Sequence, residues 1–441
     1  MLDRSPAGET EAVLITVRSG LTRFADSRIH QNVAEENAEL LVRVAHEGRV
    51  AGVRTNTLAP AELDSIAARA VEIAGRILPD SDFPGLPGPS GAQPILADTV
   101  VAATAAATPQ DRAEAVRTFI DASLGALGDA AAGVSAAGAL ATMALGRTVA
   151  NSRGVRAHGV RSRADFVAVL QDGDGSSHLS AVETDLRLLD FAALGRDAAG
   201  RAAAARHPVD LDPGTYTVLL EPEAVGLMLA YLALGTFNGR AVLEGRSALS
   251  TRMGERIMAP SIQIWDDPAD PRTVGLPFDY EGVPRGRLDL VRDGVAVGVA
   301  HDSRTARRAG VANTGRAMAQ PNTVGPIPTN VIMAPGTITR EEMIASTERG
   351  VLVSRFHYVR VVHPARTVIT GMTRDGTFLI EGGRVTRALR NLRFNQSMLE
   401  AFAGTEAVSA EGRLLGGDFG IMRYAPAITV RAFTFTSGTS F

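Results

Sequence analysis

One helix in the middle of the chain limits the possible folds more than any other segment. Tyr216 to Leu220 is an apolar run with β-branched residues, which is typical of a strand, and a helix is expected to follow it from Pro222 to Leu234. Apolar residues lie on nearly every side of this helix: Ala224, Val225, Leu227, Met228, Leu229, Leu232, Ala233 and Leu234. A helix of this kind is expected in a buried core rather than at a surface.

Length, charge and cysteine content exclude several classes of protein. A chain of 441 residues is expected to form two or three domains, since about 100 to 200 residues per domain is usual. Its 45 Lys and Arg and 48 Asp and Glu residues give a formal net charge of −3, with both signs interspersed. No basic face is visible, so we expect no nucleic-acid partner. The absence of cysteine excludes disulfides, thiolate metal sites and cysteine nucleophiles.

Neither membrane insertion nor export is expected. The longest nearly uncharged apolar run, Leu127 to Leu145, is interrupted by Asp129 and by several glycines, unlike a membrane-spanning helix. The segment that starts at Met1 lacks the charged region and apolar stretch of a secretion signal. We therefore expect a cytoplasmic protein.

The N-terminal half predicts two regions of mixed strands and helices. In the first, residues 10–80, a Glu47-Gly48 turn is expected to join two strands as a hairpin, and a helix with one apolar stripe ends near Gly75. The proline-rich residues 78–98 are expected to form a loop or linker. The second region covers residues 105–207. Its helix begins at the N-cap Thr108, and it is expected to continue with strands at 140–151, 155–171 and 179–189 and a helix at 191–205.

Residues 213–437 are expected to form a third, mainly β domain with few helices. Its expected strands are 216–220, 262–265, 287–291, 295–300, 351–362, 367–371, 377–380 and 427–435. The turns Arg292-Asp293-Gly294 and Arg374-Asp375-Gly376 are each expected to join two of them, and Thr339 with Glu342 predicts a helix-starting capping box. The predicted fold class is α+β, with a barrel-like or wrapped sheet and packed helices in this last domain.

Few groups of polar residues in the sequence indicate chemistry. His357 and His363 form the only close histidine pair, and on one extended strand they would lie about 20 Å apart, too far to share a metal ion. Structural or surface roles are the alternative for both. The sequence contains no HExxH, GxSxG, Walker A or CxxC motif.

Three other groups of residues could either bind a ligand or have only a structural or surface role. Arg153, Arg156, Arg161 and Arg163 alternate around a hairpin, where they could meet an acidic ligand or simply be solvated. The aspartates could bind a cation or belong to ordinary polar loops: Asp266, Asp267, Asp270 and Asp279. The run from Asp172 to Gly175 could suggest calcium, but it lacks the later ligands of an EF-hand and fits a hairpin turn.

Several segments in a fixed order resemble one known family. They are Gly254-Glu255-Arg256, residues 275–310, Asn313-Thr314-Gly315 and residues 385–402, and together they resemble the C-terminal domain of the TldD/PmbA (TldE) family. The D-x-E-G-x-x-x-x-R stretch at 279–287, followed by the Asp293-Gly294 hairpin, is fairly specific to this family. Residues 20–75 and 110–205 resemble the N-terminal and middle regions of the same family.

The resemblance implies a metal-free subunit. The family contains a zinc metallopeptidase subunit, TldD, and a partner subunit, TldE or PmbA, with which it forms a heterodimer. In the peptidase subunit an HExxxH motif supplies two zinc ligands and a glutamate base. An alignment without gaps places Ala230 and Gly235 at the ligand positions and Tyr231 at the base, and the family's further cysteine ligand is missing from a chain without cysteine. This implies a TldE/PmbA-like subunit, with zinc only in a TldD-like partner.

The expected partners are a TldD-like subunit or a second copy of this chain, together with an extended peptide held in a cleft by strand addition. The residues expected near this cleft are Tyr231, Asn238, Arg240, His357 and His363. Two alternatives stay open at this point. One is a stand-alone peptide-binding or scaffold protein, and the other is a catalyst of unfamiliar chemistry that uses Tyr231, His357 or His363. The family name is also linked to DNA gyrase, but no basic patch supports contact with DNA.

Overall fold

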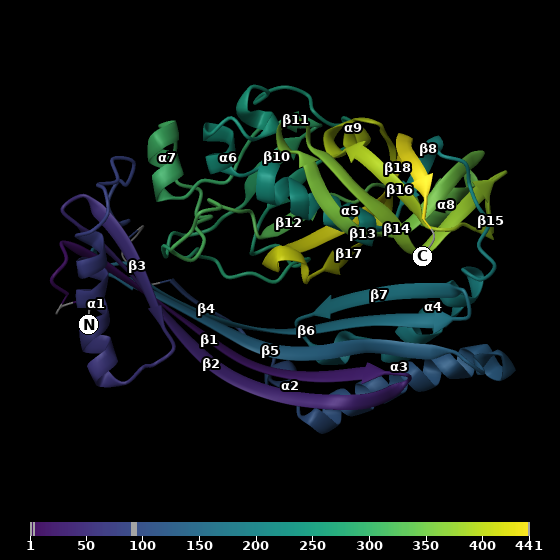
Figure 1. The fold of residues 1–441 in the computed structure, drawn as a ribbon, viewed down its shortest axis with the longest axis horizontal. Coiled ribbons are helices and arrows are strands. Elements are labelled where there is room, and N and C mark those ends of the chain that lie inside the picture. The colour runs from purple at the N-terminus through teal and green to yellow at the C-terminus, as the bar shows by residue number, and fades with distance from the viewer. Residues whose placement is uncertain (1, 3–4, 90–94, 440–441) are drawn as a thin grey trace.

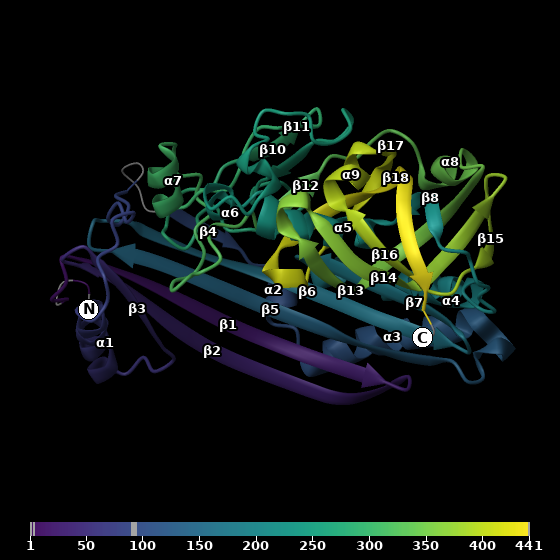
Figure 2. The ribbon, with the colours of Figure 1, turned by 45° about the horizontal axis from the view of Figure 1, so that its top comes forward.

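Two large β-sheets, each with its own helices, make up the structure. The computed structural model describes residues 2, 5–89 and 95–439. One sheet is built from the N-terminal half of the chain, and the other is built from residues after 213. In both Figure 1 and Figure 2 the C-terminal domain lies over one face of the long N-terminal sheet. The predicted α+β fold class is confirmed.

The N-terminal sheet has seven strands among the described residues, in the order β3-β2-β1-β5-β6-β4, and β7 pairs with another part of β6. The strands are β1 (Glu9–Ala25), β2 (Arg28–His46), β3 (Arg49–Thr55), β4 (Ile95–Thr99), β5 (Ser135–Asn151), β6 (Arg156–Asp172) and β7 (Gly175–Glu183). The two N-terminal regions expected from the sequence, 10–80 and 105–207, thus contribute strands to one continuous sheet. Part of the predicted 78–98 loop is a strand, β4, and residues 90–94 lie outside the described residues.

Helices cover the face of this sheet that points away from the C-terminal domain (Figure 1). They are α1 (Pro60–Ala74), α2 (Ala102–Ala105), α3 (Pro109–Leu127) and α4 (Phe191–Ala204). Phe119 of α3 packs edge-on against Phe166 of β6, with ring centroids 4.9 Å apart, in a core that also contains Phe24 and Phe191. The opposite face of the sheet is therefore free to contact the C-terminal domain.

The C-terminal sheet has eleven strands among the described residues. Its strands are β8 (Gly214–Leu220), β9 (Ile264–Asp266), β10 (Leu288–Arg292), β11 (Val295–Ala296), β12 (Asn330–Met333), β13 (Arg349–His363), β14 (Val368–Glu381), β15 (Arg384–Ala388), β16 (Leu392–Ser397), β17 (Thr405–Leu415) and β18 (Met422–Gly438). The helices are α5 (Pro222–Tyr231), α6 (Gly239–Leu243), α7 (Ser303–Ala309), α8 (Arg340–Ala345) and α9 (Met398–Ala403).

This second sheet closes on itself without forming a regular barrel. The strands β8, β13, β14, β16 and β18 pair in a ring, because β18 pairs with both β16 and β8. The strands β12, β9, β10 and β11 extend from β18 as a branch. Of the two predicted forms, the wrapped sheet describes the domain better than a barrel.

The apolar helix α5 lies in the core of this domain, as its composition predicts. It packs against β8, β13 and β18, and Val225, Leu229 and Ala230 are fully buried. The α-helix ends at Tyr231 and continues as a π-helical turn, Leu232–Thr236. The amide N–H of Phe237 donates to the carbonyl of Leu232, five residues earlier, at 2.8 Å. One residue more than an α-helix holds is therefore accommodated in this turn.

Local sequence signals give most of the element ends correctly. Thr108 caps α3 and Thr339 caps α8, each with a complete capping box. The Glu47-Gly48 and Asp293-Gly294 turns form as predicted, with positive φ at both residues of each pair.

The predicted turn at Arg374-Asp375-Gly376 is wrong, because β14 runs through it as one strand. Asp375 and Gly376 form a β-bulge opposite Ser354 of β13, since Val353 pairs with Thr377 and Arg355 with Arg374. Gly376 has a φ of 121°, and a Cβ there would lie 2.5 Å from Oγ of Ser354. A glycine is required at this position for a bulge rather than for a hairpin.

Within the described part of the chain, no helix is long and apolar enough to cross a membrane.

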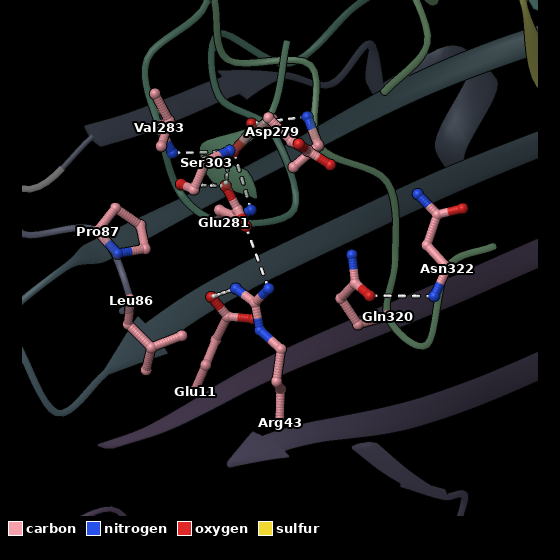
Figure 3. A network of polar contacts seen from close by, with 12 residues as sticks. Glu11, Arg43, Leu86, Pro87, Asp279, Glu281, Val283, Ser303, Gln320 and Asn322 are labelled. Atoms are coloured by element: carbon pink, nitrogen blue, oxygen red, sulfur yellow. Dashed lines mark hydrogen bonds and ion pairs between the residues drawn. The ribbon is translucent and has the colours of Figure 1, made fainter. Parts of the chain in front are cut away.

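A buried arginine joins the N-terminal sheet to a loop of the C-terminal domain (Figure 3). Arg43 of β2 is 6% exposed and contacts two carboxylates. Its Nη2 lies 2.8 Å from Oε2 of Glu11 on β1, and its Nη1 lies 3.1 Å from Oε1 of Glu281 in the C-terminal domain. The other oxygen of Glu281 accepts hydrogen bonds from the backbone N–H and hydroxyl of Ser303, at 3.1 and 2.6 Å. This cluster fixes the segment 279–287 on the N-terminal sheet.

Two carboxyl groups here titrate far above their usual range. Burial raises the pKa of Glu11 from 4.5 to about 7; the charge of Arg43 lowers it, and nearby Glu281 raises it. Burial and the proximity of Glu281 likewise raise the pKa of Asp279 to about 7. Asp279 accepts hydrogen bonds from the backbone N–H groups of Glu281, Val283 and Ala317, at 2.8 to 2.9 Å. It thus holds the turn that presents Glu281 to Arg43.

Replacing the buried cation should destabilise the protein strongly. We expect Arg43→Met to lower the free energy of unfolding by about 3 to 5 kcal/mol, because it leaves Glu11 and Glu281 buried without a counter-charge. Arg54→Met removes an exposed pair with Glu39 on the same sheet and should cost about 1 kcal/mol or less. Chemical denaturation of both variants measures the difference, and equal costs would contradict the structural role of Arg43.

The stability of the protein should fall as the pH rises from about 5 to about 7. The raised pKa of Glu11 means that the folded protein binds this proton more tightly than the unfolded chain between 4.5 and about 7. The stabilisation is therefore complete below pH 4.5 and is lost as the pH passes through about 7. Glu11→Gln, which cannot titrate, should reduce this slope in denaturant unfolding measured at several pH values. An unchanged slope would show that Glu11 is ionised throughout.

Candidate functional site

A large cavity lies between the two domains. It measures about 450 Å³ and is lined by both sheets. The N-terminal sheet contributes residues of β6 and β7, and the C-terminal domain contributes α5, β13 and the segment after β17. The lining includes Arg163, Asp165, His178, Ser180, Glu223, Leu227, Arg355, Gly416 and Arg423. We call it the interdomain cavity.

One face of α5 lines part of this cavity. Glu223, Leu227 and Tyr231 are partly exposed, whereas their neighbours on the helix are buried. They are four residues apart, so they form one stripe on the helix surface. Glu223 and Leu227 line the interdomain cavity directly. The mostly apolar helix therefore presents one narrow accessible face.

The three motif positions differ in their surroundings. Ala230 is fully buried among apolar residues of the domain core. Gly235 lies in the π turn, and a Cβ built on it would have no heavy atom within 4 Å. The hydroxyl of Tyr231 donates a hydrogen bond to the carbonyl of Val359 at 2.8 Å, and its ring lies edge-on to Phe419 with centroids 5.4 Å apart. Tyr231 and Gly235 thus reach the accessible side, and Ala230 does not.

Two other predicted cleft residues are structural. Asn238 is 1% exposed and caps α6, where its Oδ1 accepts hydrogen bonds from the backbone N–H of Arg240 and Ala241 at 3.0 and 3.1 Å. Its amide group donates to the carbonyls of Leu234 and Val324. Arg240 pairs with Glu244 at 2.8 Å and donates to the carbonyl of Thr323 at 2.7 Å. Both residues hold the 322–325 loop and do not face the cavity.

His357 and His363 do not lie on one regular strand. β13 is irregular between His357 and Arg360, and Tyr358 there has a φ of 56°. The premise of a single extended strand was therefore wrong, because a bulge changes the direction of the side chains. His363 is exposed, and its Nδ1 accepts a hydrogen bond from the backbone N–H of Arg366 at 3.3 Å. Burial and the charges of Arg374 and Arg355 lower the pKa of His357. The structure does not join the two histidines in one site.

A histidine–glutamate pair that the sequence did not suggest lies in the cavity wall. Nδ1 of His178 on β7 lies 2.7 Å from Oε2 of Glu223 at the start of α5. The other oxygen of Glu223 accepts from the backbone N–H and the hydroxyl of Ser180, at 3.0 and 2.9 Å. Burial alone would raise the pKa of Glu223, but His178, Arg413 and Ser180 together lower it. This pair is a second polar contact between the domains, and no local sequence pattern connects its members.

The arginines noted in the sequence do not form a single site, and neither do the aspartates. Arg153 pairs with Glu9, Arg156 donates to backbone carbonyls, and Arg163 pairs with Asp165 in the interdomain cavity. Asp266 is buried between Arg285 and Arg316, and Asp270 pairs with Arg272. Asp172 and Asp174 of the suggested calcium loop pair with Arg206 and His207. Asp267 and Asp279 instead accept hydrogen bonds from backbone N–H groups. These carboxylates are thus engaged by basic side chains or by the backbone.

Known proteins match this arrangement along nearly its whole length. Residues 213–437 match the family model of the PmbA/TldA metallopeptidase C-terminal domain, and residues 10–74 match that of its domain 1. This chain belongs to the PmbA/TldD family. The resemblance of the segments between 254 and 402 to this family is thereby confirmed.

Relatives and solved structures agree with this assignment. A curated protein named metalloprotease from Methanothermobacter thermautotrophicus is 24% identical over 421 residues, which cover 90% of this chain and 88% of that protein. The metalloprotease TldD homolog of Haemophilus influenzae is 29% identical over 61% of this chain and 52% of its own length. The crystal structure of TldE from Thermococcus kodakarensis superimposes with a TM-score of 0.85 at 20% identity, covering 98% of this chain and 97% of that one.

The residues at the family's metal position do not fit a zinc ion. Zinc in proteins is bound by His, Cys, Asp or Glu side chains. The alignment predicted from the sequence places Ala230 and Gly235, neither of which has a donor atom, at the two ligand positions and Tyr231 at the base. Across the described residues, no group of three or more His, Asp or Glu side chains is placed to hold a metal. No step of a zinc mechanism can be assigned to this helix.

A histidine should destabilise the protein much less at Gly235 than at Ala230. We expect Gly235→His to change the free energy of unfolding by no more than about 1 kcal/mol, since open space surrounds this position. Ala230→His should cost at least about 2 kcal/mol, because a polar ring would be forced into a filled apolar core. Chemical denaturation of the two variants gives the comparison. Similar losses for both would mean that the π turn is more tightly packed than described.

Proposed function

We propose that this chain is the non-catalytic, TldE-like subunit of a TldD/TldE-type zinc metallopeptidase, acting in the cytoplasm on unfolded peptides. The observation that carries the proposal is the loss of every zinc donor from an otherwise family-like helix. Ala230, Tyr231 and Gly235 stand where an HExxxH motif would place its ligands and base. Zinc is then supplied by a TldD-like partner, with which this chain forms a heterodimer.

The shape of α5 supports this interpretation. In an α-helix, residues five apart point in different directions, since a turn takes about 3.6 residues. The π turn at Leu232–Thr236 takes one residue more, which suits the five-residue spacing between the two histidines of an HExxxH motif. Gly235 lies in this turn beside open space. Of the three motif positions, Tyr231 and Gly235 lie on the accessible side, whereas Ala230 faces the domain core.

The interdomain cavity supports a role in binding peptide. Its volume of about 450 Å³ suits a few residues of an extended chain, and its walls combine apolar and charged side chains. β6 and β7 form one wall and β13 another, so strands flank the cavity on both sides. Among the described strands β7 pairs only with β6, so its other edge is the one that an extended peptide could use for strand addition.

A stand-alone peptide-binding or scaffold protein of the same fold is the alternative. It requires the same cavity and the same lack of zinc donors, and it differs only in having no peptidase partner. A homodimer would be compatible with it. Formation of a complex with a TldD-like protein therefore distinguishes the two functions.

The proposal is tested with the chain alone and mixed with a TldD-like protein from the same genome. We expect a heterodimer in native mass spectrometry, zinc only in the partner, and peptide hydrolysis that a chelator abolishes. A partner variant with its HExxxH glutamate changed to glutamine is the control and should form the complex without hydrolysing peptide. Stoichiometric zinc or chelator-sensitive hydrolysis in the isolated chain would contradict the proposal. Peptide binding without complex formation would support the stand-alone alternative.

A further inference from the structure

A second, smaller cavity next to the first is strongly basic. It measures about 150 Å³ and lies between strands β5 and β6 and the loops around residues 276–285 and 316–318. Four arginines line it: Arg147 and Arg161 from the N-terminal sheet, and Arg285 and Arg316 from the C-terminal domain. We call it the arginine pocket. Its walls contain four guanidinium groups but only one carboxylate, Asp279.

The carboxylates near the arginine pocket are too few to neutralise its four guanidinium groups. Asp266, behind the wall, is shared by Arg285 at 2.9 Å and Arg316 at 2.7 Å. Both oxygens of Asp279 already accept backbone N–H groups. Among the described residues, no carboxylate forms an ion pair with Arg147 or Arg161. Within the described part of the chain, two cations of the pocket therefore have no ion-pair partner, and Asp279 acts on Arg147 only from a distance.

Neutral contacts hold these two arginines in place. Arg147 is 9% exposed, and its guanidinium lies 3.5 Å from the ring centroid of Tyr280. Its Nε is buried and makes no hydrogen bond. Arg161 donates to the carbonyl of Val274 at 2.6 Å. These contacts orient the guanidinium groups but bring no negative charge, and burying an unpaired cation is costly.

The electrostatic surroundings show the same imbalance. Burial, followed by the charges of Arg147 and Arg163, lowers the pKa of Arg161 to about 9. Burial also lowers the pKa of Arg147; Tyr280 and Asp279 raise it in part, and nearby Arg285 lowers it further. A bound anion would oppose both effects. A guanidinium group is well suited to this role because its planar N–H donors match the two oxygens of a carboxylate.

We propose that the arginine pocket binds a carboxylate carried on an apolar group, and that in this protein the carboxylate is the C-terminus of an extended peptide. The apolar part of the ligand follows from the rest of the lining, which includes Leu276, Met318, Ile327 and Phe419. A free phosphate ion has no group to place against these side chains. Arg147 and Arg161 are the two residues that hold the carboxylate.

The position of the pocket connects it to the peptide site, a step that rests on the proposed function. Arg161 lines the arginine pocket, and Arg163, two residues along the same face of β6, lines the interdomain cavity. On the other side, Gly416 and Gly417 line the interdomain cavity, and Phe419 and Gly420 line the arginine pocket. A peptide that follows β6 through the first cavity would place its end in the second.

Binding of matched peptides to the isolated chain tests the proposal. A fluorescein-labelled peptide that ends in leucine with a free carboxylate is compared with the same peptide ending in an amide, by fluorescence polarisation. We expect the free acid to bind at least about tenfold more tightly, a difference of about 1.4 kcal/mol. Arg161→Gln should remove this preference. Arg156→Gln, which changes an exposed arginine at the start of the same strand, should keep it.

Small anions separate the sources of the carboxylate. Acetate should compete with the free-acid peptide and raise the thermal midpoint of the native chain, but not that of Arg161→Gln. Acetate stabilisation without an acid–amide difference would assign the pocket to small carboxylates rather than to peptide ends. Equal binding of acid and amide with no effect of acetate, or stronger competition by inorganic phosphate than by acetate, would overturn the proposal. Because no partner is present, these outcomes do not depend on whether the chain forms a heterodimer.

Discussion

The contact of Arg43 with two carboxylates from different domains is the interaction on which the functional surfaces depend. Both cavities have walls from the N-terminal sheet and from the C-terminal domain, so neither would exist if the domains separated. The segment 279–287 makes this contact with three of its charged residues. Asp279 organises the turn, Glu281 reaches Arg43, and Arg285 pairs with buried Asp266. This one short stretch thus docks the two domains.

Signals that act within a few residues were readable from the sequence. The caps at Thr108 and Thr339 and the Asp293-Gly294 turn each depend on atoms close along the chain. The Asp375-Gly376 pair shows the limit of this reasoning, since the same dipeptide forms a bulge when a neighbouring strand pairs on both sides of it. Nothing within the pair itself distinguishes the two outcomes.

The site was only partly predictable for the same reason. The resemblance placed Ala230, Tyr231 and Gly235 at the motif positions of α5, but it could not show that Ala230 faces the core or that Asn238 is a buried cap. His178 and Glu223 are 45 residues apart and meet only because β7 and α5 belong to facing domains. The four arginines of the arginine pocket come from four separate places in the chain, and only Arg161 was noted in the sequence, as a member of a hairpin group. Contacts between domains are set by the docking geometry, which local patterns do not encode.

The π turn after α5 makes this segment sensitive to its length. Each residue advances an α-helix by about 100° around its axis. If one residue were deleted between Leu232 and Thr236, the α-helix would continue without the wide turn, and everything after it would be rotated by about that angle. Asn238 would then point away from the carbonyl of Val324 that it now contacts, and α6 would lose its cap. The number of residues between α5 and α6 is therefore fixed by the geometry of this turn.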